Sequence, residues 1–158
     1  ADGKRLDPVA AVTGTPLAVA RSSRGMAVGD LFNDGNLCVV INNMDASPTV
    51  LCHKPQNKNH WVELHLVGSG KSPRDAVGAT VYVTAGAQRQ RGDIVAGGSF
   101  ASSSDPRVHV GLGAVKKVDE VEIHWPDGRK QALSPPEVDR IVTVEESAGP
   151  VEAAGMAR

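Results

Sequence analysis

Glycine and proline interrupt this 158-residue chain at short intervals, and this punctuation limits what it can fold into. The 17 glycines and 10 prolines make up 27 of 158 residues, a share above the roughly 12% of average proteins. Between them lie short β-prone runs, and no window holds a 3.6-residue apolar stripe longer than about two helical turns. The sequence therefore predicts an all-β fold of short antiparallel strands and turns.

The clearest strand pattern lies in the second half of the chain. Residues 61–67 and 77–84 alternate, with aliphatic side chains on one face and polar or aromatic side chains on the other. Further strands are expected at residues 88–95, 107–112, 118–125, 131–133 and 140–145. Together these segments predict an antiparallel β-sandwich or barrel-like domain over residues 60–146.

The first part of the chain is less regular. Residues 1–23 are aperiodic and broken by proline and glycine, so we expect an extended arm. Residues 24–53 contain short β-prone runs around the polar loop 30–36 and predict a meander of three strands. Residues 53–60 are polar and lack periodicity, which predicts a linker, and residues 147–158 are expected to form a flexible tail.

Charge and aromatic content exclude several classes of protein. Seventeen basic and eighteen acidic residues leave a net charge of −1, without the basic excess that nucleic acids or anionic membranes attract. Two Trp, two Phe and one Tyr are too few for a base-stacking platform. The longest apolar run, Leu37–Ile41, is far shorter than the roughly 18 residues of a membrane helix. We therefore expect no nucleic-acid partner and no transmembrane segment, and the start at Ala1 fits a processed or excised product.

The loop at residues 30–36 (DLFNDGN) carries part of a calcium-binding pattern. In the form D-x-D-x-D-G-x-x-D, alternate acidic side chains converge on Ca²⁺ and the glycine permits the bend. Two of the four acidic positions hold Phe32 and Cys38 instead. The remaining candidate ligands are Asp30, Asp34 and Asn36. The alternative is that these side chains cap a turn between two strands.

Several segments of the chain resemble known extracellular modules. Residues 24–35 (RGMAVGDLFNDG) resemble an FG-GAP or VCBS-type repeat, one blade of a β-propeller. Residues 59–61 (NHW), 102–113 (SSSDPRVHVGLG) and 121–128 (VEIHWPDG) resemble the ASPIC/UnbV domain of cartilage-acidic-protein-like extracellular proteins. The resemblance spans residues 24–145, and its second half is the more specific.

The resemblance implies both an architecture and a role. It implies a degenerate, partial propeller blade at residues 24–53 beside an ASPIC/UnbV-like β domain at residues 60–146. The family implies a secreted or periplasmic protein, usually with several propeller repeats ahead of this domain. It also implies binding or adhesion, and it supplies no established catalytic reaction.

The two cysteines mark departures from the blade pattern and predict a disulfide. In a hairpin centred on Asp45, Cys38 and Cys52 lie directly opposite each other. Cross-strand Cβ atoms are about 4.5–5.5 Å apart, which suits a disulfide. An exported protein meets the oxidising conditions in which such a bond persists. The alternative is two buried free thiols.

Two groups of polar residues raise other possibilities. Asp105 and His109 share a strand face near Ser102, which suggests a hydrolase, but no Gly-x-Ser-x-Gly elbow is present and a turn with Arg107 paired to a carboxylate is the simpler interpretation. Glu63 and His65 on one strand, with Glu122 and His124 on another, can hold zinc or copper if the strands are neighbours. The simpler interpretation of these four is a solvent-facing polar surface.

We therefore expect a non-catalytic, exported binding or structural module. It is either part of a larger propeller protein or a subunit whose exposed sheet edges pair with a protein partner or a second copy. The alternative is a calcium-stabilised adhesion or carbohydrate-binding module that recognises a glycan, with Ca²⁺ as its cofactor. A hydrolase is the third and least favoured hypothesis, so we expect that the chain is not an enzyme.

Overall fold

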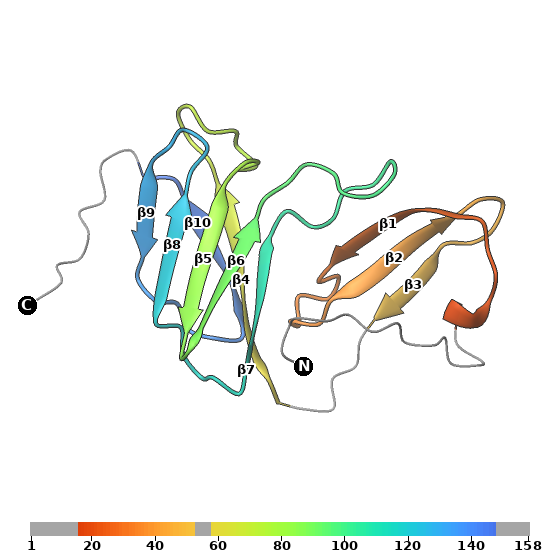
Figure 1. Ribbon diagram of the computed structural model, residues 1–158, viewed down its shortest axis with the longest axis horizontal. Helices are drawn as coiled ribbons and strands as arrows, with labels where there is room; N and C mark the ends of the chain where they lie inside the picture. Colours follow the sequence, from red (N-terminus) through yellow and green to blue (C-terminus); the bar gives the residue numbers. More distant parts are fainter. Residues whose placement is uncertain (1–15, 53–57, 148–158) are drawn as a thin grey trace, which may run out of the picture.

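The computed structural model describes residues 16–52 and 58–147, and its regular structure is almost entirely β (Figure 1). One 3-10 turn, η1 (Pro16–Ala18), precedes ten strands in these residues. The strands are β1 (Ser23–Gly29), β2 (Cys38–Asn43), β3 (Thr49–Cys52), β4 (His60–Val67), β5 (Thr80–Ala85), β6 (Gln88–Asp93), β7 (Val108–Gly113), β8 (Glu120–His124), β9 (Lys130–Leu133) and β10 (Arg140–Glu145). The predicted all-β class is confirmed. Within the described residues, no helix has the length and apolar character needed to cross a membrane.

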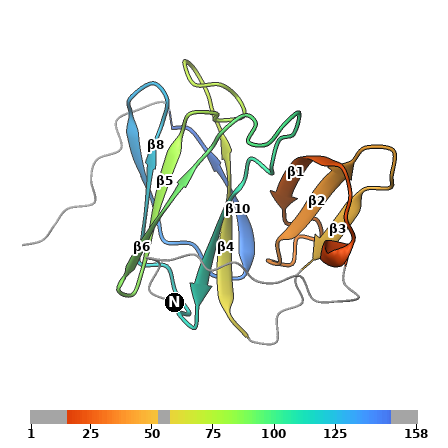
Figure 2. The same ribbon diagram turned by 45° about the vertical axis from the view of Figure 1, so that its right-hand side comes forward.

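Strands β4 to β10 form a β-sandwich, which we call the sandwich (residues 60–146). One sheet has the order β10-β4-β7 and the other has the order β6-β5-β8-β9 (Figures 1 and 2). Alternate aliphatic side chains from both sheets fill the space between them, as the sequence alternation predicts. The fully buried members include Val62, Leu64, Val81, Val121 and Ile123. The described residues form no closed barrel, so the sandwich is the correct one of the two predicted forms.

One strand pair departs from the predicted antiparallel arrangement. Strand β10 runs parallel to β4, with Arg140 opposite Val62 and Val144 opposite Leu66. A parallel pair needs a long crossover connection, and here the whole second sheet and β7 lie between the two strands in sequence. The β10-β4-β7 sheet is therefore mixed.

Strands β1 to β3 form a separate antiparallel sheet, which we call the meander (residues 23–52). It lies beside the sandwich in both views (Figures 1 and 2). The hydrophobic core cluster is built from residues 62–144 and contains no residue of the meander. The meander therefore packs against the sandwich without sharing its core.

Three predicted segments fall mostly outside the described residues. These are residues 1–15 of the predicted arm, 53–57 of the predicted linker and 148–158 of the predicted tail. The rest of the arm holds η1 and the first residue of β1. The predictions for these three segments stay untested.

Candidate functional site

The seam between the meander and the sandwich begins at a serine-containing loop, residues 99–105, which we call the serine loop. The backbone N–H of Met26 donates to Ser99 Oγ at 3.2 Å, and that of Val28 donates to Ser104 Oγ at 3.2 Å. The N–H of Asp105 donates to the carbonyl of Val28 at 2.9 Å. Among the described residues β1 has no strand on this side, and two hydroxyl groups and one amide take the place of one and protect the edge from pairing with another chain.

Two glycines allow the close approach at this seam. A Cβ atom on Gly25 would lie 2.1 Å from Ser102 Oγ and 2.5 Å from the carbonyl oxygen of Phe100. Gly35 has φ +82°, and a Cβ there would lie 2.1 Å from Nε1 of Trp61. Any side chain at these positions would push the meander away from the sandwich.

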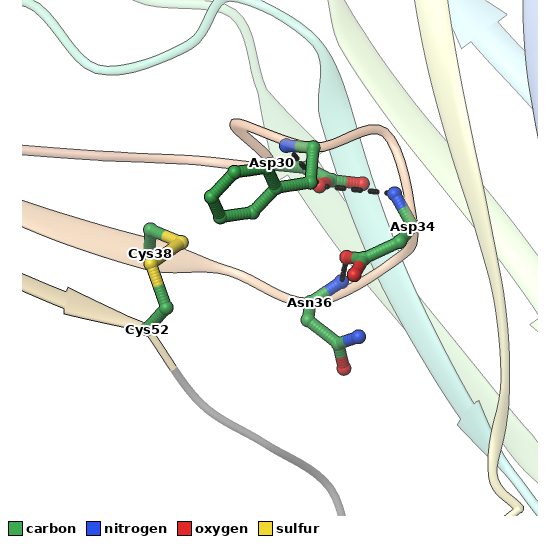
Figure 3. Close-up of a disulfide and its surroundings, with 6 residues drawn as sticks. Asp30, Asp34, Asn36, Cys38 and Cys52 are labelled. Atoms are coloured by element: carbon green, nitrogen blue, oxygen red, sulfur yellow. Dashed lines mark hydrogen bonds between the residues drawn. A yellow bond between two sulfur atoms is a disulfide. The ribbon is translucent and has the colours of Figure 1, made fainter.

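The acidic loop at residues 30–36 is closed by its own backbone (Figure 3). The buried carboxylate of Asp30 accepts hydrogen bonds from the N–H groups of Phe32, Asp34 and Gly35, at 3.3, 3.2 and 2.7 Å. The carboxylate of Asp34 accepts the N–H of Asn36 at 3.0 Å. This is the geometry of the turn-capping alternative.

Calcium binding by Asp30, Asp34 and Asn36 stays a prediction. In the part of the chain that the structure describes, no group of three His, Cys, Asp or Glu side chains is placed to hold a metal ion. Asn36 and backbone carbonyls are further oxygen donors. A calcium ion would nevertheless compete for the carboxylate of Asp30 with the three backbone N–H groups that already donate to it.

A guanidinium group supplies a positive charge to this loop. Arg107 donates to the carbonyl of Asp30 at 3.0 Å through Nη2 and to Oδ1 of Asn33 at 2.7 Å through Nη1. On the sandwich side, its Nε donates to both carboxylate oxygens of Asp105 at 3.0 and 2.9 Å. The predicted pairing of Arg107 with a nearby carboxylate is thus confirmed, and the same side chain also binds the meander.

The ion pair between Arg107 and Asp105 shifts the pKa of each side chain so that its charged form is favoured. Hydrogen bonds to Asp105 raise the pKa of Arg107. Burial alone would raise the pKa of Asp105, but the hydrogen bonds from Arg107 outweigh it and hold this pKa below its usual value. Both groups therefore remain ionised at neutral pH.

Glu63 lies fully buried behind this pair, on the face of β4 that points away from the core. Among the described residues, neither carboxylate oxygen has a hydrogen-bond partner. Nη1 of Arg107 is 3.1 Å from Oε2, close enough for an ion pair but not aligned as a hydrogen bond. Burial raises the pKa of Glu63 from 4.5 to about 7; the charge of Arg107 lowers it, and those of Asp105 and Asp30 raise it.

His109 is the cross-strand partner of Glu63 on β7. Its Nδ1 is buried and has no hydrogen-bond partner among the described residues. Its ring stacks on Trp61, with ring centroids 5.9 Å apart and planes at 14°. Burial lowers the pKa of His109, so the imidazole is neutral at pH 7.

The structure does not assemble the other predicted constellations. Strands β4 and β8 belong to different sheets, so the condition for a metal cluster of Glu63 and His65 with Glu122 and His124 is not met. The interpretation of Glu63 as a solvent-facing residue is also wrong, because the seam buries it. In the group that suggested a hydrolase, the hydroxyl of Ser102 donates to the backbone carbonyl of Phe100.

The predicted disulfide is confirmed (Figure 3). Cys38 and Cys52 are register partners on β2 and β3, and their sulfur atoms are bonded at 2.10 Å. Cys38 is buried while Cys52 is exposed. The bond therefore fixes the open end of the β2–β3 hairpin with little help from apolar burial.

The sandwich also identifies the family of the chain. The family model for ASPIC and UnbV matches residues 68–151, which is just over half of the 158 residues. The chain belongs to the ASPIC and UnbV family. No curated protein matches it. The match starts after β4, which is the central strand of the β10-β4-β7 sheet.

Proposed function

We propose that the chain is a non-catalytic binding or structural module in which the sandwich is a stable base and the meander is the contact surface. The observation that carries this proposal is where large apolar side chains are exposed. Among the described residues, nine large apolar side chains are exposed, and all nine lie in residues 16–52 or in the segment 95–100 near β1. They are Val19, Met26, Leu31, Phe32, Leu37, Met44, Val50, Val95 and Phe100.

The exposure is large at two aromatic side chains. Phe32 is 68% exposed and Phe100 is 74% exposed. Aromatic side chains, Phe among them, are enriched in the buried cores of protein interfaces. Strands β4 to β10, within the described residues, expose no large apolar side chain. This contrast supports a partner that covers the meander and the adjoining segment 95–100 rather than the strands of the sandwich.

Both faces of the meander carry apolar residues. The register places Met26 and Ile41 on one face, and Val40 and Val50 on the other. Each of these residues is exposed or half-buried. A propeller blade has this character because it packs between two neighbouring blades, so the pattern supports the proposal that residues 24–53 are a degenerate FG-GAP or VCBS-type repeat.

A sheet edge supports the alternative form, in which the chain is a subunit. Among the described residues, β3 pairs with β2 and has no strand on its other side. Unpaired edges accept an additional strand from another chain. Val50, 52% exposed, lies on this strand. The cover is therefore either further repeats of the same protein or a strand from a partner.

The disulfide supports export. Disulfides persist in secreted and periplasmic proteins and are rare in the reducing cytosol. The bond between Cys38 and Cys52 thus fits a secreted or periplasmic location, which we propose for this chain.

The proposal is tested by charging the exposed edge. We expect Val50→Lys to abolish partner binding or self-association, measured by analytical ultracentrifugation of the chain alone and with proteins recovered from its native source. Ala132→Lys is the matched control, because Ala132 is exposed on β9, the edge strand of the sandwich. Equal effects of both variants would count against the meander as the contact surface.

The propeller form has its own test. The reading frame upstream of Ala1 is sequenced, and the longer product is compared with this chain by hydrogen exchange. Added repeats should slow exchange in β1 to β3 and leave the sandwich unchanged. A frame without repeats, together with a monodisperse monomer that recovers no partner, would overturn the proposal.

A further inference from the structure

Among the described residues around Arg107, acidic side chains outnumber basic ones. Three carboxylates, Asp30, Glu63 and Asp105, lie around the single guanidinium of Arg107, while His109 is neutral. Asp30 and Asp105 are each hydrogen-bonded. Glu63 is the member without a hydrogen bond among the described residues. An ionised Glu63 is therefore the least compensated charge of the cluster.

A second buried glutamate, Glu146, has the hydrogen-bond partners that Glu63 lacks. Glu146 accepts the N–H of Ser69 at 2.6 Å, the hydroxyl of Ser72 at 2.8 Å and Nη2 of Arg129 at 2.6 Å. Glu63 is buried at least as deeply but has a single misaligned contact with Arg107. The fold thus supplies hydrogen-bond donors to the buried carboxylate of Glu146 but not to that of Glu63.

Arg107 cannot turn fully to Glu63 without releasing other partners. Its Nε is committed to Asp105, and its two terminal nitrogens donate to Asn33 and to the carbonyl of Asp30 in the meander. The nitrogen nearest to Glu63 is Nη1, which also binds Asn33. A charge on Glu63 therefore competes with the meander for the same guanidinium.

The groups that face Glu63 come from four elements. His65 lies on β4 itself, and His109 lies opposite on β7, two residues from Arg107. The register partner on β10 is Ile141, followed on the same face by Thr143, so β10 adds no charge directly opposite. Asp30 of the meander and Asp105 of the serine loop complete the set.

We propose that proton uptake and release by Glu63 sets how firmly the meander is held on the sandwich, with Arg107 as the link between them. With Glu63 protonated, Arg107 faces only the carboxylates of Asp105 and Asp30, and its terminal nitrogens bind Asn33 and the loop carbonyl of Asp30. With Glu63 ionised, the buried charge draws the guanidinium towards itself and repels Asp30, and the meander loosens. The inference does not depend on what covers the meander.

The direction of the pH effect follows from the raised pKa of Glu63. Its value is about 7 when the meander is docked, against 4.5 for a free side chain. The docked state therefore holds the proton more tightly, so the contribution of Glu63 to docking is full below about pH 4.5 and is lost as the pH rises through about 7. The lowered pKa of His109 acts in the opposite sense, since its stabilising effect is lost as the pH falls.

Hydrogen exchange at two amides tests the proposal in the whole chain. The N–H of Asp105 bonds to Val28 across the seam, and the N–H of Ile94 bonds to Ala79 inside the sandwich. We expect the protection factor of Asp105, divided by that of Ile94, to fall at least about tenfold between roughly pH 5 and pH 7.5, because each unit of pKa difference is a factor of ten. In Glu63→Gln this fall should be absent, and any remaining change should be the opposite rise with pH that His109 contributes, whereas Glu120→Gln, an exposed carboxylate on β8, should retain the wild-type fall.

Three results would overturn the proposal. The wild-type ratio could stay constant over this pH range, or both amides could lose protection equally. The fall could also persist in Glu63→Gln. If Glu63→Gln does not fold, the wild-type ratio together with a direct carbon-13 NMR titration of the Glu63 carboxyl decides the matter, because the two midpoints must coincide.

Discussion

The sandwich and the meander are stabilised by different forces. The sandwich has one continuous core from Val62 to Val144, whereas Cys38 is the one buried apolar residue that the described meander contributes. The meander is held instead by a disulfide, by hydrogen bonds to the serine loop and by the guanidinium of Arg107. Apolar burial is insensitive to pH and redox conditions, whereas the disulfide depends on redox conditions and the charged groups around Arg107 depend on pH. The two regions should therefore respond differently to the same perturbation.

The largest difference should come from matched leucine truncations. Leu64→Ala removes a fully buried side chain from the sandwich and should lower the free energy of unfolding by about 3–4 kcal/mol. Leu51→Ala removes a half-buried side chain from β3 and should cost about 1 kcal/mol or less. Urea unfolding followed by far-UV circular dichroism measures both. Similar costs would show that the meander shares the core after all.

Loss of the disulfide should act on the meander alone. It joins residues that are 14 apart in sequence, and in the chain-entropy model such a loop contributes about 3 kcal/mol. Reduction, or the double change Cys38→Ser with Cys52→Ser, should speed amide exchange in β1 to β3. Exchange at Ile94 in the sandwich is the internal reference. Equal acceleration there would contradict separate stabilisation.

A smaller effect is expected at the serine loop. Ser104→Ala leaves the N–H of Val28 without its acceptor, which should cost about 1 kcal/mol in the opening of the β1 edge. Ser103→Ala is the matched control, because the Ser103 hydroxyl bonds within the loop, to the carbonyl of Ser104. Exchange of the Val28 amide should accelerate in the first variant and remain unchanged in the second.

The smallest effect is expected from calcium. Because Asp30 already accepts three backbone N–H groups and Arg107 supplies a cation, millimolar calcium should shift the melting temperature by less than about 1 °C relative to chelator. Differential scanning calorimetry with calcium and with chelator measures this shift of the melting temperature. A larger rise that disappears in Asp34→Asn would instead support the calcium-stabilised adhesion module.

Features that depend on local sequence were predictable. The predicted strand 140–145 coincides with β10, and 61–67 differs from β4 by one residue, because a period of two marks a half-buried strand without knowledge of its neighbours. The disulfide followed from the symmetry of one hairpin, since turn position sets strand register. These predictions needed no information about distant contacts.

Features that depend on distant contacts were not predictable. Alternation correctly places Glu63 on the face opposite Leu64, but it cannot show that the meander and Arg107 cover that face. The link from Arg107 to Asp30 joins residues 77 apart in sequence. The parallel direction of β10 also left no local signal, because a strand has the same side-chain pattern in either direction.

The parallel pairing of β10 with β4 has a consequence for synthesis. After β4 has been made, its parallel neighbour begins only at Arg140, and at roughly 5–20 residues per second the ribosome needs on the order of ten seconds to reach it. Throughout that interval one edge of β4 has no partner, and Val144 is missing from the core. The nascent chain is thus exposed to aggregation until β10 is made, and a chain that ends before residue 140 should be cleared as unfolded protein.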